Sequence, residues 1–168
     1  MLNDEHSIST GSGFRPGRLN GGSHLATSYN DIYDRAIFRF ADYDFLKLDI
    51  ESREDILEKY LHSAVADVSV IVEAGTLDID DDNREFVGDI DNEVQEILAL
   101  GIDYYWLSAK VQNSELLRNS LSTKDFTYFS PANLMRELIN LRNDVKNEYR
   151  SAITFYSYNH GDFESLKN

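Results

Sequence analysis

The chain has 168 residues, of which 42% are hydrophobic and 27% charged, a composition typical of one globular domain with a single core. Its formal net charge of −14 argues against a protein that neutralises nucleic-acid phosphates over its whole surface. The absence of cysteine excludes disulfides, thiolate metal sites and cysteine nucleophiles. No basic and apolar signal segment precedes the body, so we expect an intracellular protein without membrane contact.

Residues 1–27 contain most of the glycines of the chain and few apolar residues. Such a segment cannot bury enough apolar surface to fold by itself, so we expect an extended arm. Two interpretations stay open for it. It is either a disordered terminus or an arm that orders on a neighbouring subunit, in which case Phe14, Arg15 and Arg18 are the expected contacts.

Two helices are expected in the first half of the body. Ser28 can cap a helix that ends near Ala41, with apolar residues at helical spacing from Ile32 onward. After a connector over residues 42–49, either Asp49 or Ser52 can cap a second helix that reaches about residue 72. Its apolar stripe has the 3.6-residue period of an amphipathic helix and comprises Ile56, Leu57, Tyr60, Leu61, Ala64, Val65, Val68 and Ile71.

Residues 73–91 are polar and acidic, which predicts a loop with room for a short strand. Its aspartates at 78, 80, 82 and 89 fall on positions one, three, five and twelve of a calcium-binding loop. The match is partial, because Asn83 replaces the central glycine and Asp89 is shorter than the usual bidentate glutamate. We therefore interpret this segment as a solvated acidic loop and expect no metal or other cofactor.

Three helices are expected in the second half. The spacing predicts one over residues 92–110, where Gly101 indicates a close helix contact, and a shorter one over residues 113–121. Ser130 and Pro131 then form a helix start signal. The last helix has one apolar seam that can brace a bundle or pack on a symmetry mate, formed by Leu134, Leu138, Leu141, Val145, Tyr149, Ile153 and Tyr156.

Together these elements predict an all-α fold, a four- to five-helix bundle with an extended Gly-rich N-terminal arm and a long C-terminal helix. The expected organisation is an arm over residues 1–27, a helical domain over residues 28–158 and a tail over residues 159–168. The basic residues of the last helix are interleaved with acidic ones, which favours a mixed-charge solvated face over a DNA-contacting strip.

No catalytic constellation is visible. The four histidines are scattered, no Gly-rich phosphate loop occurs, and carboxylate pairs carry no weight among 30 acidic residues. We therefore expect no enzyme activity.

Several pieces of the second half resemble, in order and spacing, the small neck proteins that act as head-tail connectors of tailed bacteriophages. The pieces are the EILALGIDYYWL run at 96–107, the segment 113–121, Lys124-Asp-Phe, the YFSPANL run at 128–134, and a long helix that ends in ITFYSY at 153–158. The resemblance covers residues 93–158 and, more distantly, 28–72. The arm and the acidic loop have no counterpart.

This resemblance implies a structural virion protein of the neck, assembled in the host cytoplasm. It implies a homo-oligomeric ring, typically twelvefold, that contacts the portal protein and the next neck or tail protein while DNA passes through its lumen without sequence-specific binding. Extended arms and C-terminal segments reach neighbours in such assemblies. The residues expected to do so in the C-terminal region are Phe155, Tyr156, Tyr158 and Phe163.

Other functions stay open. A head-closure protein or tail terminator would need a β-rich fold that this periodicity does not favour, and a small terminase subunit would need a basic helix-turn-helix. A soluble acidic regulatory module that responds to calcium is the alternative from another class, and a hydrolase would need a nucleophile and base that we do not identify.

Overall fold

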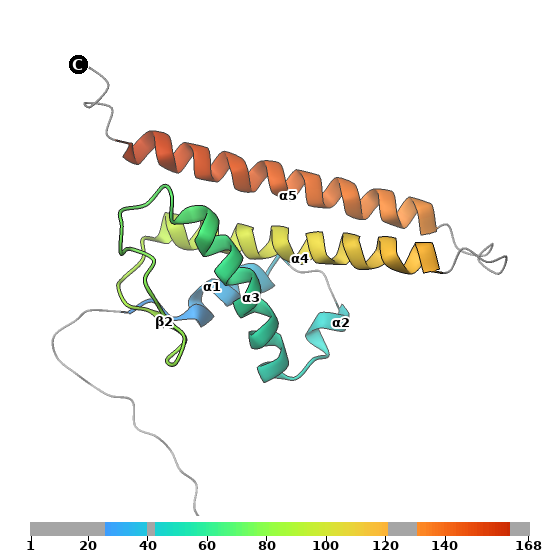
Figure 1. Cartoon of the computed structure of the whole chain (residues 1–168), viewed down its shortest axis with the longest axis horizontal. Helices are drawn as coiled ribbons and strands as arrows, with labels where there is room; N and C mark the ends of the chain where they lie inside the picture. Colours follow the sequence, from blue (N-terminus) through green and yellow to red (C-terminus); the bar gives the residue numbers. More distant parts are fainter. Residues whose placement is uncertain (1–25, 40–42, 121–130, 162–168) are drawn as a thin grey trace, which may run out of the picture.

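The computed structural model describes residues 26–39, 43–120 and 131–161, and these residues are mainly helical (Figure 1). Two short strands interrupt the helices. In chain order the elements are α1 (Tyr29–Ile37), α2 (Tyr43–Leu46), α3 (Ile50–Val68), β1 (Ile79–Asp80), β2 (Glu85–Phe86), α4 (Asn92–Ser120) and α5 (Pro131–His160). The mainly helical fold class is therefore as expected, and the C-terminal helix is 30 residues long.

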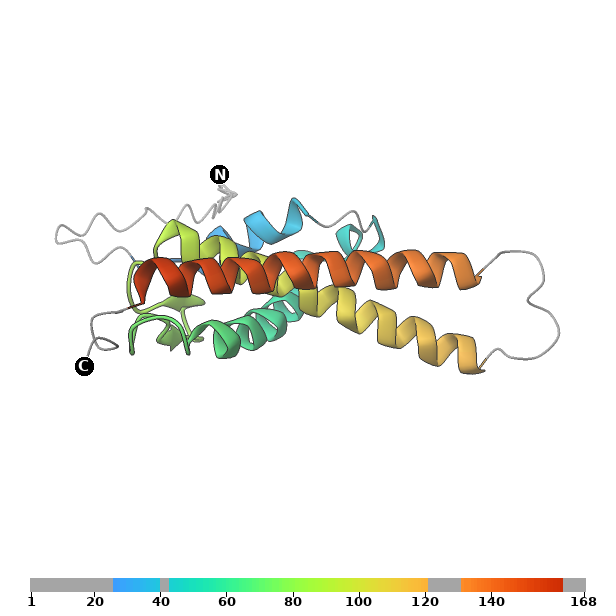
Figure 2. The same cartoon turned by 90° about the horizontal axis from the view of Figure 1, so that it is seen from above.

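The helix α4 lies at the centre and packs against α1, α3 and α5. Figure 1 places α5 on one side of α4, with α1 and α3 on the other. The helices α4 and α5 run antiparallel and diverge toward the end that contains Ser120 and Pro131 (Figure 2). The molecule thus consists of a long helical hairpin, and the smaller elements pack against one half of it.

The core forms where α1, α3, the hairpin and the first half of α4 meet. Its largest fully buried side chains come from all of these elements, and they are Tyr29, Ile32, Leu57, Leu61, Val68, Phe86, Ile90, Val94, Ile97, Leu98, Ile102 and Leu107. Burying a large apolar side chain stabilises the fold by about 1.5–3 kcal/mol. The apolar spacing of the predicted stripes is therefore explained by this shared core.

Hydrogen bonds connect the β1–β2 hairpin to the start of α1. The two strands pair antiparallel, with Ile79 opposite Phe86. Backbone bonds of 2.8 Å from Phe86 N to Thr27 O and 3.0 Å from Tyr29 N to Arg84 O add the segment before α1 to this small sheet. The stretch 73–91, expected as a loop with a short strand, is thus an ordered hairpin against the helical core.

The helix starts follow the cap signals, and two ends differ from the prediction. The Ser28 side chain accepts a hydrogen bond from Asn30 N, and that of Asp49 accepts one from Ser52 N. The helix α3 ends at Val68 rather than near residue 72. The helix α1 ends at Ile37, with Phe38 as its C-cap, and not near Ala41. The connector that follows includes the short helix α2.

The prediction of two helices over residues 92–110 and 113–121 was wrong, because α4 is continuous from Asn92 to Ser120. Asn113 is a residue type that can cap a helix, but no Gly or Pro interrupts the helix over residues 102–120. Buried Val111 holds this part of α4 in the structure. A polar residue that can cap a helix also fits inside one when its neighbours keep the helical hydrogen bonds.

Candidate interaction surfaces

One face of α5 is buried from Met135 to Tyr149, and two leucines beside that face are exposed. Val145 and Tyr149 are buried against the rest of the fold. Leu134 and Leu141, one heptad apart, are 62% and 50% exposed. Met135, next to Leu134, is buried, so the two leucines lie beside the buried face of the helix and not on it. Their side chains are therefore available to a partner.

Two of the aromatic residues expected to make contacts lie on the outside of the last turns of α5. Phe155 is 68% and Tyr158 66% exposed. Tyr156 instead packs against the core, and its ring stacks on His160 at 4.1 Å between centroids. The outward aromatic surface is thus formed by Phe155 and Tyr158. The other expected contacts, Phe14, Arg15, Arg18 and Phe163, lie outside the described residues.

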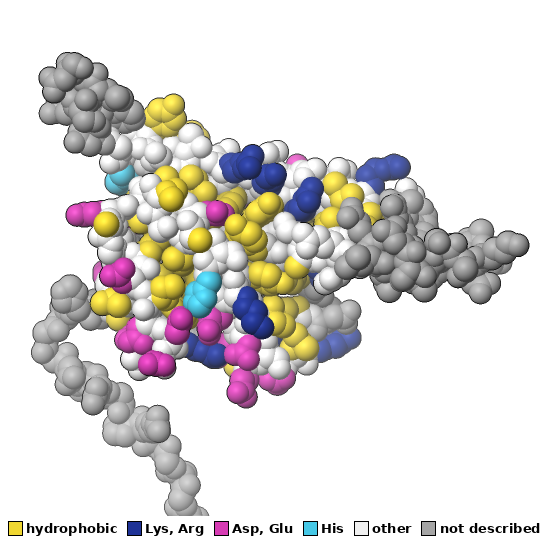
Figure 3. Space-filling view, viewed as in Figure 1, with side chains coloured by type: hydrophobic (Ala, Val, Ile, Leu, Met, Phe, Trp, Pro, Cys, Tyr) yellow, Lys and Arg dark blue, Asp and Glu magenta, His cyan; other side chains and the backbone are white. Residues whose placement is uncertain are grey.

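Charge is divided unequally between the two sides of the molecule. The basic residues of α5 are Arg136, Arg142, Lys146 and Arg150, beside the acidic Glu137, Asp144 and Glu148. The segment 73–93 has a single basic residue, Arg84, and its acidic residues are Glu73, Asp78, Asp80, Asp81, Asp82, Glu85, Asp89, Asp91 and Glu93. In Figure 3 dark blue groups follow α5, while most magenta groups gather on the opposite side, where further dark blue groups lie among them. We call these the basic face and the acidic face.

Arg84 fixes the acidic hairpin to α3. Its guanidinium contacts Glu54 at 2.5 Å, Asp55 at 2.8 Å and Glu58 at 3.2 Å. Arg84 has a positive φ of 53° at the turn between β1 and β2, a conformation that costs a non-glycine residue energy. One positive charge thus offsets only part of three negative ones, and the surface around the hairpin stays strongly negative.

The aspartates of the calcium-loop pattern do not converge on one point. Both oxygens of Asp80 accept hydrogen bonds from Asn83, at 3.2 Å from its N and 2.8 Å from its Nδ2. Asp89 lies beside Thr27, whose hydroxyl is 3.4 Å from it. Asp80 closes the hairpin turn, and Asp89 follows β2. The structure therefore assigns these carboxylates to the hairpin rather than to a calcium loop.

The structure brings together a histidine and two carboxylates that sequence reasoning missed. The Nε2 atom of His62 lies 3.0 Å from Oδ1 of Asp81, and Glu58 is one helical turn before His62 on α3. A second group, made of Asp91, Glu93 and His160, is fully exposed. The i, i+4 spacing of Glu58 and His62 was the one sequence signal, while the approach of Asp81 depends on the hairpin.

An aspartate is buried between α1, α4 and α5. Asp103 on α4 is 6% exposed, and its burial raises the pKa to about 6, although the positive charge of Arg39 opposes that shift. Arg39 also contacts Glu96 at 3.4 Å and Glu148 at 3.5 Å. This network connects the end of α1 to both long helices.

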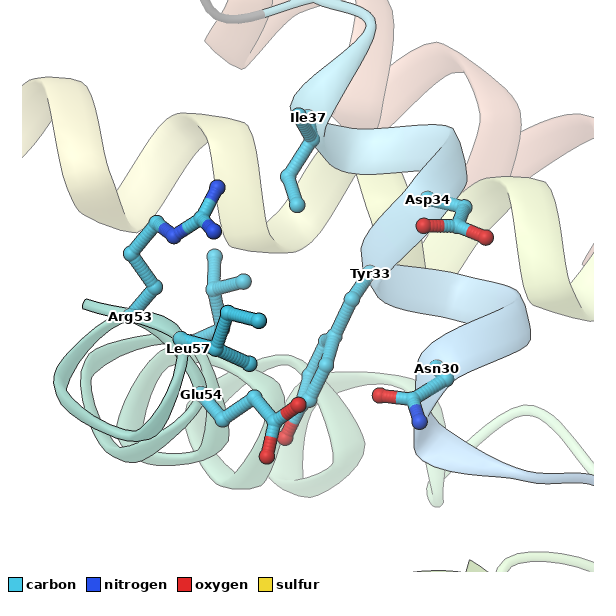
Figure 4. Close-up of a pocket in the computed structure, with 8 residues that line it drawn as sticks. Asn30, Tyr33, Asp34, Ile37, Arg53, Glu54 and Leu57 are labelled. Atoms are coloured by element: carbon cyan, nitrogen blue, oxygen red, sulfur yellow. The ribbon is translucent and has the colours of Figure 1, made fainter. Parts of the chain in front are cut away.

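Two clefts lie beside α3. The first, of about 320 Å³, lies between α1 and α3 (Figure 4). The Tyr33 hydroxyl and Arg53 Nε are buried beside it without a hydrogen-bond partner in the described part of the protein, so they can bond to water or to a polar group that enters. The second cleft is bordered by Asp67, which accepts a 2.7 Å hydrogen bond from the Tyr105 hydroxyl, and by Lys146.

Among the described residues, no helix is both long and apolar enough to cross a membrane. A scan against protein-family models finds no match, and searches of the curated proteins and of the solved structures find no similar protein.

Proposed function

We propose that the chain is a structural virion protein, a head-tail connector that forms a ring between portal and tail, with DNA passing through its lumen. The observation that carries the proposal is the difference in charge on one subunit between α5, with four basic residues, and the segment 73–93, with nine acidic ones. The exposed Leu134 and Leu141 of α5 add apolar contact area. The resemblance of residues 93–158 to neck proteins supports the location in the virion. Its action is binding, with no chemical turnover.

The two faces lie on different sides of α4, so one subunit can present its basic face to the acidic face of the next. Such a contact joins unlike surfaces, and it closes into a ring when the rotation per subunit divides a full turn. Complementary potentials favour the correct neighbour and speed association. The contact between two copies would join Lys146 and Arg150 of one with the hairpin region of the other.

The remaining negative charge suits a ring around DNA. The chain has a formal charge of −14, and the acidic face has more charges than the basic face can neutralise. Like charge repels the phosphates and leaves no basic clamp on which DNA would stall. Phe155 and Tyr158, at the end of α5, are the proposed contacts to the portal or the next neck protein.

A charge-exchange experiment tests the mode of association. One variant carries Lys146→Glu and Arg150→Glu, and the other Asp78→Lys and Asp82→Lys. Each variant alone should weaken the contact, because the exchanged side chains then face charges of their own sign. An equimolar mixture should recover alternating rings, which native mass spectrometry detects. Association that is unchanged in the single variants, or not recovered in the mixture, would contradict the head-to-tail contact.

The location is tested by cryo-electron microscopy of the particles that contain this chain. A symmetric ring at the junction of portal and tail, with acidic side chains toward the lumen, is the expected result. A position elsewhere in the particle would favour a different neck or tail component. Complete absence from particles would favour the soluble acidic binding module.

A further inference from the structure

Glu58, His62 and Asp81 place their ligand atoms within 4.8 Å of one another. Glu58 and His62 are on the same face of α3, because residues four apart in a helix are neighbours. Asp81 comes from the hairpin turn, in a different part of the chain. One imidazole nitrogen and two carboxylates from two elements make a set of three ligands whose fourth position is open to water.

Each carboxylate of this set is oriented by a donor outside it. The Tyr29 hydroxyl donates a 2.8 Å hydrogen bond to Asp81, and Arg84 Nε lies 3.2 Å from Oε2 of Glu58. Tyr29 is fully buried, and its ring packs on Phe86 with 5.2 Å between centroids. Outer donors of this kind orient the ligands of metal sites.

The separations are compatible with a bound ion. With metal-ligand distances of about 2.0–2.2 Å, two ligands of a tetrahedral site are roughly 3.3 Å apart. His62 Nε2 and Asp81 Oδ1 are 3.0 Å apart, so a shift of a few tenths of an ångström admits the ion. Arg84 is shared among three carboxylates of α3, and so the negative charge of the hairpin turn is left to attract a cation.

We propose that Glu58, His62 and Asp81 bind a divalent transition-metal ion of the Zn²⁺ type, which fastens the β1–β2 hairpin to α3. The imidazole determines the class of metal, since Ca²⁺ and Mg²⁺ prefer oxygen ligands alone, whereas Zn²⁺ combines imidazole with carboxylates. The site goes beyond the proposed ring. Bound metal would lower the negative charge of the acidic face and make the hairpin more rigid.

Isothermal titration calorimetry of the full chain with ZnCl₂ tests this site. We expect one Zn²⁺ bound with participation of His62, and His62→Gln or Asp81→Asn should weaken binding at least tenfold. Tyr29→Phe removes only the hydroxyl that orients Asp81 and keeps the buried ring, so it should weaken binding by about ten- to a hundredfold. Millimolar Ca²⁺ or Mg²⁺ should not displace the ion.

The matched control is His160→Gln, which removes the histidine of the exposed group Asp91, Glu93 and His160. It should leave the first binding event unchanged. Absence of Zn²⁺ binding, binding insensitive to both His62→Gln and Tyr29→Phe, or loss of it in His160→Gln would each overturn the site. Because the titration uses isolated subunits, its failure would leave the charge-exchange test of the ring unaffected, and the reverse also holds.

Hydrogen exchange supplies a second readout. Zn²⁺ should slow amide exchange over residues 79–86 in the wild type and leave it unchanged in His62→Gln, because only the intact site joins the hairpin to α3. Protection that is equal in both proteins would show that the ion binds elsewhere and would likewise overturn the proposal.

Discussion

A Cβ atom at Gly101 would lie 2.5 Å from the Cβ of Ala64, so α3 and α4 cross at a distance that only glycine permits. The same Cβ would lie 3.0 Å from the Tyr149 hydroxyl oxygen of α5. Three helices therefore meet at one residue. The sequence indicated a close helix contact at Gly101, and the structure confirms it and identifies the partners.

Replacing this glycine should destabilise the protein. Overpacking costs typically about 1–3 kcal/mol, while alanine gains about 1 kcal/mol over glycine in a helix interior. We expect Gly101→Ala to lower the free energy of unfolding by about 1–2 kcal/mol in urea denaturation. Gly88→Ala is the control, because a Cβ there meets nothing within 4 Å. Equal stability of the two variants would contradict the close crossing.

The buried carboxyl of Asp103 should make stability depend on pH. Burial raises its pKa from 3.8 to about 6, so the folded protein holds the proton more tightly than the unfolded chain. The stabilisation that the protonated Asp103 carboxyl gives to the fold is fully present below about pH 4 and is lost as the pH rises through about 6. At neutral pH, Asp103→Asn should therefore stabilise the fold by up to about 3 kcal/mol.

The measurement for Asp103 is the difference in unfolding free energy between the wild type and Asp103→Asn from pH 4 to pH 8. Taking the difference removes the opposite contribution of carboxyls whose pKa is lowered, such as Asp49 and Asp80. The gain of the variant should grow with pH across this window. A flat difference would show that the carboxyl does not titrate as its burial requires.

The Arg84 contacts should stabilise the hairpin through geometry as well as charge. Arg84→Lys keeps one positive charge but cannot reach three carboxylates with a planar fork. We expect Arg84→Lys to lower the unfolding free energy by about 1 kcal/mol and Arg84→Ala by about 1–2 kcal/mol, both less at high salt. Thermal unfolding at two salt concentrations measures this, and a negligible effect of Arg84→Lys would reduce the role of Arg84 to its charge.

The exposed leucines of α5 should matter for association rather than for folding. Leu134→Gln with Leu141→Gln should change the unfolding free energy by less than about 0.5 kcal/mol and reduce the assembled fraction. Val145→Ala, on the buried face of α5, should cost about 2 kcal/mol. Sedimentation velocity and urea denaturation separate the two effects. Unaltered assembly in the leucine variant would exclude this surface from the ring contact.

Phe155 and Tyr158 should also matter for association and not for folding, in this case for binding to the portal or the next neck protein. Phe155→Ser with Tyr158→Ser should leave folding intact, because both side chains are largely exposed. The variant should fail to enter particles, which immunoblotting of purified virions measures. Tyr149→Ser is the stability control and should lose about 3–5 kcal/mol. Normal incorporation of the double variant would exclude the two aromatic residues from the contact.

The sequence by itself determined the elements. Apolar residues at steps of three and four predicted the helices, and Ser28 and Asp49 marked where two of them begin, because these signals act within a few residues. The same local signals were misleading at Asn113, where a cap residue lies inside a continuous helix. Gly101 indicated a close helix contact, yet the sequence could not identify Ala64 as the residue that it contacts.

Only the tertiary structure decided which surfaces and clusters exist. His62 acquires its carboxylate neighbour from a hairpin 19 residues away in sequence, and Arg84 reaches α3 across a similar separation. The predicted α5 seam includes both Val145 and Leu134, but the rest of the fold covers only Val145, and Leu134 is exposed. Periodicity records which residues share a face, while burial depends on whether another element covers that face.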